Sequence, residues 1–400
     1  MDANDSYDVA VIGAGLAGLE CGRRLCSAGL RVLMIDRKPD ISRSVHTTGI
    51  FVRRTLEDFD LPESCLGPPI RQVVLHSPAR RPLFLSSPHD EFRVGRMGAL
   101  YDRRLVECLN LGVHWSPATR LKAIEGGEKA SRVSISIRGR ARTVSARYVV
   151  GADGVASATA RALGLDTNRR WIVGAEDVFR GVPRGGPPRF HCFLDPDLAP
   201  GYLAWIVDDG QETHLGVGGI PGRFDIARSL ELFRREARAH VDLRSARLVE
   251  RRGGPIPVGG ILANIANGRG LLVGDAAGAP SPLTAGGLDP CLRLSALAAS
   301  VIVRHLGGKG SALQAYSGRA LRRRFRLRLA LRAVMNLTTS RTLVELGCFL
   351  LRRTPLRSVA TEIFFGRGTV SRGGSPSCEA GRCRRTSGRR CLCGSTCWGS

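Results

Sequence analysis

The sequence predicts an α/β fold with two interleaved parts, a Rossmann-like, three-layer domain built on a parallel sheet and a mostly antiparallel β-sheet domain, followed by C-terminal helices. Three observations predict it. A strand, a glycine-rich turn, a helix and a second strand follow one another within residues 7–36. Residues from about 170 to 265 are mostly strands. After them, a second glycine-rich turn joins a short strand to a long helix.

The first unit begins with YDVAVIGAG, which reads as a buried strand because Val9, Val11 and Ile12 favour β structure and the run ends at glycine. LAGLECGRRLCSAG then has helical spacing and stops at Gly29, and LRVLMID forms a second strand. A β-α-β unit of about thirty residues is typical of a parallel nucleotide-binding sheet.

The later elements alternate between the two parts. Residues 71–86 predict a hairpin that turns at Ser77 and Pro78, and YDRRLVECLNLGV predicts a helix. RVSISIRG and RTVSARYVVGADG predict a meander that ends in a buried strand. The expected division is a nucleotide-binding domain (1–68, 96–168 and 266–311), a substrate domain (69–95 and 169–265), a helical segment (312–366) and a disordered tail (367–400).

The net charge of +25 invites a nucleic-acid hypothesis, but the charge is concentrated at one end. From residue 301 onward there are 20 Lys and Arg against 3 Asp and Glu. We therefore expect no nucleic-acid partner. No run of about 20 apolar residues occurs, and the acidic start MDANDSYD does not resemble a signal peptide, so we expect a cytoplasmic protein.

The basic segment 312–366 is predicted to be helical. Its arginines at 322, 323, 324, 326 and 328 fall around the whole helical wheel, which favours packing beside the main body and leaves peripheral membrane association as the alternative. Five cysteines lie in the last 23 residues, but their spacing does not fit paired zinc ligands, so we predict no metal site.

The turn after the first strand carries G-x-G-x-x-G at Gly13, Gly15 and Gly18. The first glycine permits the tight turn, the second lets the backbone approach a pyrophosphate, and the third permits close helix packing. Asp36 ends the second strand, where a carboxylate can accept hydrogen bonds from a ribose. This half-site fits NAD or FAD equally well.

Two further motifs favour FAD. They are YVVGADGVASATAR and LLVGDAAGAPSPLTAGGLDP. FAD is elongated and needs anchors for its ribityl chain and flavin ring. A carboxylate such as Asp275 suits ribityl hydroxyls, and the glycines around it allow close approach.

The three motifs in this order resemble the flavoproteins that include the para-hydroxybenzoate hydroxylase-type monooxygenases and, within that group, the geranylgeranyl reductase family. GDAAGAPSPLTAGGL carries the resemblance most specifically, and the likeness extends over about residues 7–310. It implies an FAD-dependent oxidoreductase that passes hydride from NAD(P)H or another donor, through flavin N5, to the double bond of a small apolar substrate such as an isoprenoid or a polyketide-like compound. The alternatives are an FAD-dependent monooxygenase that uses NAD(P)H and O2, and a non-catalytic basic binding protein.

The resemblance also implies positions for the cofactor. The ADP half would lie at the first turn, and Asp153 and Gly154 would lie near the pyrophosphate and the NAD(P)H pathway. The late turn would hold the ribityl chain and pass beneath the flavin ring. The implied cofactor-binding residues are Gly13, Ala14, Gly15, Leu16, Ala17, Gly18, Asp36, Arg37, Asp153, Gly154, Gly274, Asp275, Pro282, Gly286, Gly287 and Leu288.

Two departures from the family pattern concern the late turn. Ala285 replaces the first of three glycines, which requires a negative φ at that residue. Asp289 followed by Pro290 looks like a helix N-cap with proline at the first helical position, and a proton-handling role for Asp289 is the alternative. No catalytic residue is established by the sequence, and the candidates are His46, Thr48 and Asp289.

The substrate candidates are Tyr202 and Trp205. In the reductases a tyrosine lies two residues before the tryptophan, whereas here the separation is three. On a regular strand this separation places the rings on opposite faces, so we expect only one of them to line the pocket. The sequence does not predict the oligomeric state.

Overall fold

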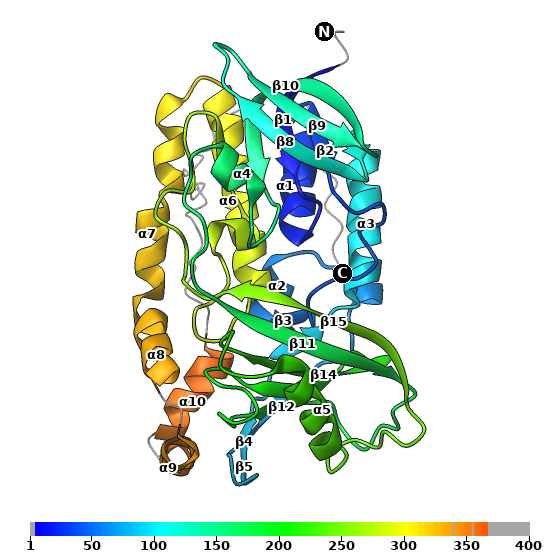
Figure 1. The fold of residues 1–400 in the computed structure, drawn as a ribbon, viewed down its shortest axis with the longest axis vertical. Helices are drawn as coiled ribbons and strands as arrows, with labels where there is room; N and C mark the ends of the chain where they lie inside the picture. The colour runs from blue at the N-terminus through cyan, green and yellow to red at the C-terminus, as the bar shows by residue number, and fades with distance from the viewer. Residues whose placement is uncertain (1–4, 338–339, 354–355, 367–400) are drawn as a thin grey trace, which may run out of the picture. The chain divides into compact units, whose positions relative to one another are not determined.

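The computed structural model describes residues 5–337, 340–353 and 356–366 (Figure 1). The first sheet has the order β7-β2-β1-β10-β9-β8, and β16 pairs with β10. Its strands are β1 (Ser6–Ile12), β2 (Val32–Ile35), β7 (His114–Ser116), β8 (Thr119–Glu125), β9 (Ser131–Ile137), β10 (Arg140–Gly151) and β16 (Gly270–Leu272). The strands β7, β2, β1, β10 and β16 pair in parallel, as the β-α-β pattern predicts.

The long strand β10 joins two kinds of sheet. Its first half pairs antiparallel with β9, and its second half pairs parallel with β1. The helices α1 (Leu16–Ser27), α3 (Met97–Asn110) and α6 (Leu288–Leu306) pack together, with α1 in contact with both of the others. A single large core lies around these helices and the sheet. The predicted nucleotide-binding architecture is confirmed.

The second sheet has the order β15-β11-β14-β13-β12-β4-β5 and is antiparallel except where β12 pairs with β4. Its strands are β4 (Gln72–His76), β5 (Pro82–Ser86), β11 (Trp171–Arg180), β12 (Arg189–Phe193), β13 (Ala204–Asp208), β14 (Glu212–Gly219) and β15 (Arg247–Pro257). The predicted hairpin is therefore its outer edge. The strands come from two separate stretches of chain, and the exact domain boundaries stay a prediction.

Helix α5 (Ile226–Ala237) was not anticipated within this β region. Asp225 caps it by accepting hydrogen bonds from the N–H groups of Ala227 and Arg228. Its apolar side packs on β11 and β14, which gives the second sheet a separate core on that face. Smaller elements connect the two sheets: β3 (Ile50–Val52), β6 (Phe92–Val94), α2 (Arg53–Asp58), α4 (Ala158–Ala162), and the 3-10 turns η2 (Glu63–Cys65) and η3 (Gly274–Ala277).

The segment after α6 is helical, as predicted. It contains η4 (Gly310–Tyr316), α7 (Gly318–Arg322), η5 (Arg323–Phe325), α8 (Arg326–Leu337), α9 (Arg341–Leu351) and α10 (Leu356–Phe365). Leu321 and Phe325 enter the first core, and Arg322 donates to the carbonyls of Gly259 and Ile261 at 2.9 Å. In Figure 1, α7 and α8 follow one another down the left of the view. Among the described residues, no helix is both long and apolar enough to cross a membrane, and the expected disordered tail lies outside them.

Candidate flavin-binding and substrate site

The first glycine turn has the geometry that a dinucleotide requires. Gly13 adopts φ +104°, and a Cβ atom there would lie 2.4 Å from the Ala152 carbonyl oxygen. A Cβ atom on Gly18 would lie 1.9 Å from the Gly13 carbonyl oxygen. Gly15 is the N-cap of α1, and no described atom lies within 4 Å of a Cβ built on it. Two glycines are therefore required by packing, whereas Gly15 borders open space where the helix dipole favours an anion.

Asp36 lies at the end of β2, as predicted. Its Oδ2 accepts a hydrogen bond of 2.8 Å from the N–H of Ala14, and its Oδ1 accepts one of 2.8 Å from the backbone N–H of Lys38. The carboxylate thus supports the turn itself, and its remaining lone pairs are available to a ribose. Arg37 beside it is exposed.

The late glycine turn lies directly against the first one. Gly274 adopts φ +58°, and a Cβ atom there would lie 2.8 Å from the Cβ of Ala17 on α1. Asp275 follows, and within the described chain no hydrogen bond or ion pair involves its carboxylate. Burial raises the pKa of Asp275 to about 6. An unpaired, desolvated carboxylate facing the N-terminus of α6 is suited to the hydroxyl groups of a ribityl chain.

Tyr101 on α3 is a residue that sequence reasoning missed. It lies within hydrogen-bonding reach of the Leu16 backbone and close to Asp36 and Asp275. Burial raises the pKa of its hydroxyl well above the usual range, so the group stays a neutral donor. Tyr101 thus stands between the two glycine turns. The only sequence signal for it was an aromatic residue on a helix that otherwise looked like ordinary packing.

The carboxylate of Asp153 accepts its hydrogen bonds from within the protein. Its Oδ1 accepts a hydrogen bond of 2.6 Å from Ser157, and its Oδ2 accepts bonds from the N–H and hydroxyl of Thr159. These bonds hold the start of α4. Because a Cβ atom on Gly13 would also contact the Asp153 backbone, Asp153 and Gly154 lie beside the first glycine turn, as the resemblance implies.

The loop before α6 differs from expectation in two ways. Ala285 adopts φ +52°, so the negative φ that would make alanine harmless there is not present. The helix begins at Leu288 with Gly287 as its N-cap, so the N-cap prediction for Asp289 is wrong. Asp289 lies in the first turn instead, where its Oδ1 accepts hydrogen bonds from Thr55 at 3.0 Å and Arg293 at 2.8 Å.

These two differences leave the N-terminus of α6 open. In the described chain, no side chain caps this helix end. The N–H groups that begin with Leu288 therefore remain available for the carbonyl edge of a flavin ring, and Asp289 does not compete for them. Gly286 is exposed in the same loop, while Pro282 is buried beneath it.

Replacing Ala285 with glycine is expected to raise the free energy of unfolding by about 1 kcal/mol, because a left-handed backbone costs a side chain roughly that much. Chemical denaturation measures it. As a matched control, Ala296→Gly inside α6 should lower the stability by about 1 kcal/mol. If Ala285→Gly also destabilises the protein, the left-handed conformation of this loop is wrong.

Tyr202 and Trp205 lie side by side, so the expectation that their rings fall on opposite faces is wrong, and which of them lines the substrate pocket stays a prediction. Tyr202 precedes β13, so the alternation of side chains between the two faces of a strand does not apply to it. The two ring centroids are 6.5 Å apart with the planes nearly perpendicular. Trp205 covers Gly216, where a Cβ atom would lie 2.1 Å from the indole, and Tyr202 covers Gly218. The G-x-G on β14 thus provides room for both rings.

The aromatic pair connects two loops of the candidate site. The Tyr202 hydroxyl donates a 2.7 Å hydrogen bond to the Thr284 carbonyl, in the loop before α6. The Trp205 indole N–H donates a 2.9 Å bond to Glu176, and the Thr48 hydroxyl donates to the same carboxylate oxygen. Thr48 is therefore hydrogen-bonded within the candidate site, whereas His46 lies exposed on the same loop.

Glu176 is the centre of a buried charged cluster that the sequence did not reveal. It lies on β11, with His214 on β14 at 3.1 Å and Arg252 on β15 at 2.7 Å. Asp209 lies 3.5 Å from the other nitrogen of His214. The two carboxylates and two cations balance each other, which allows this cluster to be buried.

The charges within this cluster set the protonation states of Glu176 and His214. Burial opposes ionisation of Glu176, but the neighbouring His214 and Arg252 outweigh burial and lower the pKa of the carboxyl. Burial alone would lower the pKa of His214, but Glu176 and Asp209 outweigh it and raise the pKa to about 9. His214 is therefore an imidazolium at neutral pH, and it holds Glu176 in place beneath Trp205.

Arg332 on α8 is a second missed residue. Its side chain is only 4% exposed, and its Nε and Nη1 atoms have no hydrogen-bond partner among the described residues. It lies near Tyr202, and burial lowers the pKa of its guanidinium. One turn earlier, Arg328 donates a 3.1 Å bond to the Ser281 hydroxyl. The inner face of α8 thus presents two guanidinium groups to the region of Tyr202 and the loop before α6.

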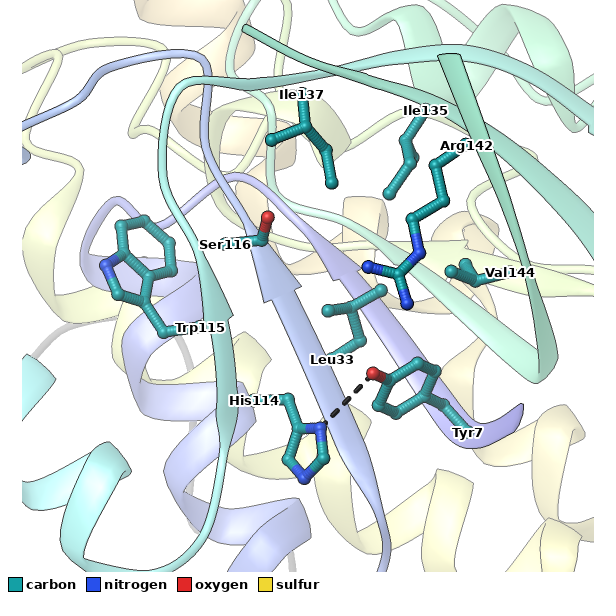
Figure 2. Close-up of a pocket in the computed structure, with 9 residues that line it drawn as sticks. All are labelled: Tyr7, Leu33, His114, Trp115, Ser116, Ile135, Ile137, Arg142 and Val144. Atoms are coloured by element: carbon teal, nitrogen blue, oxygen red, sulfur yellow. Dashed lines mark hydrogen bonds between the residues drawn. The ribbon is translucent and has the colours of Figure 1, made fainter. Parts of the chain in front are cut away.

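A separate cavity of about 340 Å³ lies between the parallel strands and the meander (Figure 2). Leu33 and Ile135 line it, and the Tyr7 hydroxyl lies 3.2 Å from His114 Nδ1 at its edge. None of the predicted site residues lines this cavity. The candidate site is instead defined by the two glycine turns, the loop before α6 and the Tyr202–Trp205 pair.

Comparisons with known proteins agree with this fold. Residues 8–179 match the family described as lycopene cyclase protein. Digeranylgeranylglycerophospholipid reductase 1 of Methanococcoides burtonii is 26% identical over 71% of each chain. A geranylgeranyl bacteriochlorophyll reductase-like structure from Thermoplasma acidophilum has a TM-score of 0.79 at 20% identity, covering 90% of this chain and 95% of that one. p-Nitrophenol 4-monooxygenase of Pseudomonas putida has a TM-score of 0.72 at 17% identity, covering 91% and 99%.

The fold and the relatives together define an FAD-dependent oxidoreductase. The residues of the two glycine turns fit that cofactor, since they combine tight glycines, open helix ends and an unpaired carboxylate. Within this class, the predicted resemblance to the geranylgeranyl reductases is confirmed by the reductases among its relatives.

Proposed function

We propose that this chain reduces a carbon–carbon double bond in an apolar, isoprenoid-like substrate that also carries an anionic group, and that NADH or NADPH supplies the electrons. The aromatic pair of Tyr202 and Trp205 carries the proposal, because it provides an apolar wall that is hydrogen-bonded to the loops expected around the flavin. The named activity of the sequence relatives supports reduction over oxygenation.

Bound FAD would supply two-electron chemistry, in which one alkene carbon gains a hydride and the other gains a proton from water or the protein. The chain's own residues would hold the reactants. The N–H groups at the N-termini of α1 and α6 would bind the pyrophosphate and the flavin carbonyl edge. Asp275 would accept hydrogen bonds from ribityl hydroxyls. Glu176, fixed by His214, would keep Trp205 in one orientation against the substrate.

The anionic group of the substrate would meet Arg332 and Arg328. A buried guanidinium with unpaired donors is costly to the fold, and an incoming phosphate or carboxylate would pair with it. The polar end of the substrate would therefore lie at the inner face of α8, close to Tyr202.

Arg332→Met is expected to have opposite effects on stability and binding. It should raise the free energy of unfolding by about 1 kcal/mol or more, because a buried unpaired charge is removed. It should also raise the KM for geranylgeranyl phosphate roughly 10- to 100-fold, since a charge-assisted hydrogen bond contributes about 1.5–3 kcal/mol. Geranylgeraniol, which lacks the anion, should be affected little.

The matched control is Arg326→Met, which changes an exposed arginine on the same helix and should alter neither property. An equal rise in KM for the phosphate and the alcohol would show that Arg332 packs against the substrate chain and does not recognise an anion.

The reaction type is tested without oxygen. The holoprotein, reduced with NADH or NADPH under anaerobic conditions, should convert the isoprenoid probe to a product heavier by two hydrogens per reduced bond, as read by mass spectrometry. Product that forms only in air and carries an added oxygen atom would replace reduction with monooxygenation.

We further propose that the C-terminal helices bring the protein to an anionic lipid surface, from which such a substrate would enter. Leu343, Leu346, Phe349 and Leu350 of α9 are exposed along one side of that helix. Arg341 and Arg353, also exposed, lie at its ends. Apolar contact combined with basic charge suits an anionic bilayer. Co-sedimentation with vesicles that contain phosphatidylglycerol, compared with neutral vesicles, tests this proposal.

A further inference from the structure

Three histidines meet on the second sheet, away from the site described above. His76 ends β4, His191 lies on the neighbouring strand β12, and His240 follows α5. The His76 ring stacks on Phe193 with centroids 4.2 Å apart, and the His240 ring lies 4.7 Å from that of His76. Because His191 and Phe193 are two residues apart on one strand, they share the face that α5 covers. Trp205 and Cys192 pack on the opposite face.

The nitrogens have the spacing of a metal site. One ring nitrogen from each histidine lies within 4.8 Å of the other two. Nε2 of His76 and Nδ1 of His191 are 3.1 Å apart. Two imidazole nitrogens bound to one tetrahedral Zn²⁺ would be roughly 3.4 Å apart, because Zn–N bonds are about 2.0–2.1 Å long. His240 is exposed on a turn, so it can close the remaining distance by a small movement of its side chain.

Internal hydrogen bonding accounts for only part of the cluster, because His76 Nε2 and His191 Nδ1 are within hydrogen-bonding distance of each other but the other nitrogen of His76 is left over. His76 is 4% exposed, and its Nδ1 has no hydrogen-bond partner in the described chain. Buried polar atoms are ordinarily paired. Arg80 would oppose a cation nearby, but its guanidinium is held by Asp195 at 2.8 Å and Glu236 at 2.5 Å. Arg341 also contacts Asp195, at 3.6 Å, so the two carboxylates balance the two arginines; Arg189, which also faces His191, lies at the first residue of β12.

We propose that His76, His191 and His240 bind one Zn²⁺ ion that links the end of α5 to the β4–β12 edge of the second sheet. Imidazole is a preferred ligand of zinc, and three histidines leave a fourth position for water. The ion stabilises the fold by linking α5 to the sheet, and it lies across the sheet from Trp205. This proposal is independent of the proposed reaction.

The test uses the full chain, stripped of metal by a chelator and with its cysteines blocked by N-ethylmaleimide. Isothermal titration with Zn²⁺ alone should show one site, and zinc should raise the Tm. His240→Asn removes an exposed ligand without disturbing the core, and it should weaken binding at least about 10-fold and abolish the Tm shift. His89→Asn, an exposed histidine on another loop, is the matched control and should leave both unchanged.

Co²⁺ gives a second measurement. Tetrahedral binding by imidazole should produce visible absorption bands in wild type that are lost in His240→Asn. Equal zinc stoichiometry and affinity in wild type and His240→Asn would overturn the proposal, as would the absence of any zinc-dependent change in Tm.

Discussion

Gly15→Ala is expected to weaken FAD binding about 10- to 100-fold while leaving the stability of the cofactor-free protein unchanged. A Cβ atom on Gly15 meets no described atom within 4 Å, and its φ of −70° suits alanine, so the fold accepts the change. The same methyl group would occupy the space of the pyrophosphate, and overpacking a bound group costs roughly 1–3 kcal/mol. Titration with FAD, followed by fluorescence quenching, measures the effect.

Gly22→Ala is the matched control, because it makes the same chemical change on the same helix. Its Cβ would lie 3.6 Å from Met34 Sδ, an ordinary contact. We expect unchanged FAD affinity and a gain of about 0.5–1 kcal/mol in stability, since alanine replaces glycine inside a helix. If Gly15→Ala binds FAD as tightly as wild type, no pyrophosphate lies at this turn.

Glu176→Gln is expected to lower the free energy of unfolding by about 3–5 kcal/mol, because it leaves His214 and Arg252 without their shared buried counter-charge. Denaturant titration measures the loss. Glu250→Gln is the matched control. Glu250 also contacts Arg252, at 3.4 Å, but it is partly exposed, so its removal should cost less than about 1 kcal/mol. Similar losses in both variants would mean that burial does not strengthen the Glu176 contacts.

The difference between wild type and Glu176→Gln should depend on pH. The pKa of His214 is raised from 6.5 to about 9 in the folded protein. The stabilisation that comes from this shift is therefore complete below pH 6.5 and is lost as the pH rises through 9. We expect the stability difference to be largest between pH 4.5 and 6.5, to narrow towards pH 9, and to narrow also below pH 4.5, where the stabilisation from the lowered pKa of Glu176 is lost. A difference that grows with pH would contradict a protonated His214.

The parts of the fold that sequence reasoning predicted are those that local patterns determine. The strand Ser6–Ile12, the turn at Gly13 and the helix from Leu16 are adjacent in the chain, and both the β propensities and the glycine spacing apply to them directly. The turn at Gly274 was predicted for the same reason. That the two turns touch, through Gly274 and Ala17, followed only from the family resemblance.

The parts that were missed depend on contacts between distant residues. Glu176, His214 and Arg252 belong to three neighbouring strands, and no local pattern pairs them. The error at Asp289 had a different cause. Asp-Pro is a common start for a helix, but here the helix begins two residues earlier, at Leu288, and Arg293 donates a hydrogen bond to the Asp289 carboxylate. The opposite-face argument for Tyr202 failed because that residue lies before the strand.

FAD that lies extended across the two glycine turns should appear in the absorption spectrum of the purified full chain after titration with FAD. We expect one tightly bound flavin per chain, which loses its visible absorption when NADH or NADPH is added without oxygen. A well-folded chain that takes up no flavin at micromolar concentrations would show that the two turns do not hold FAD.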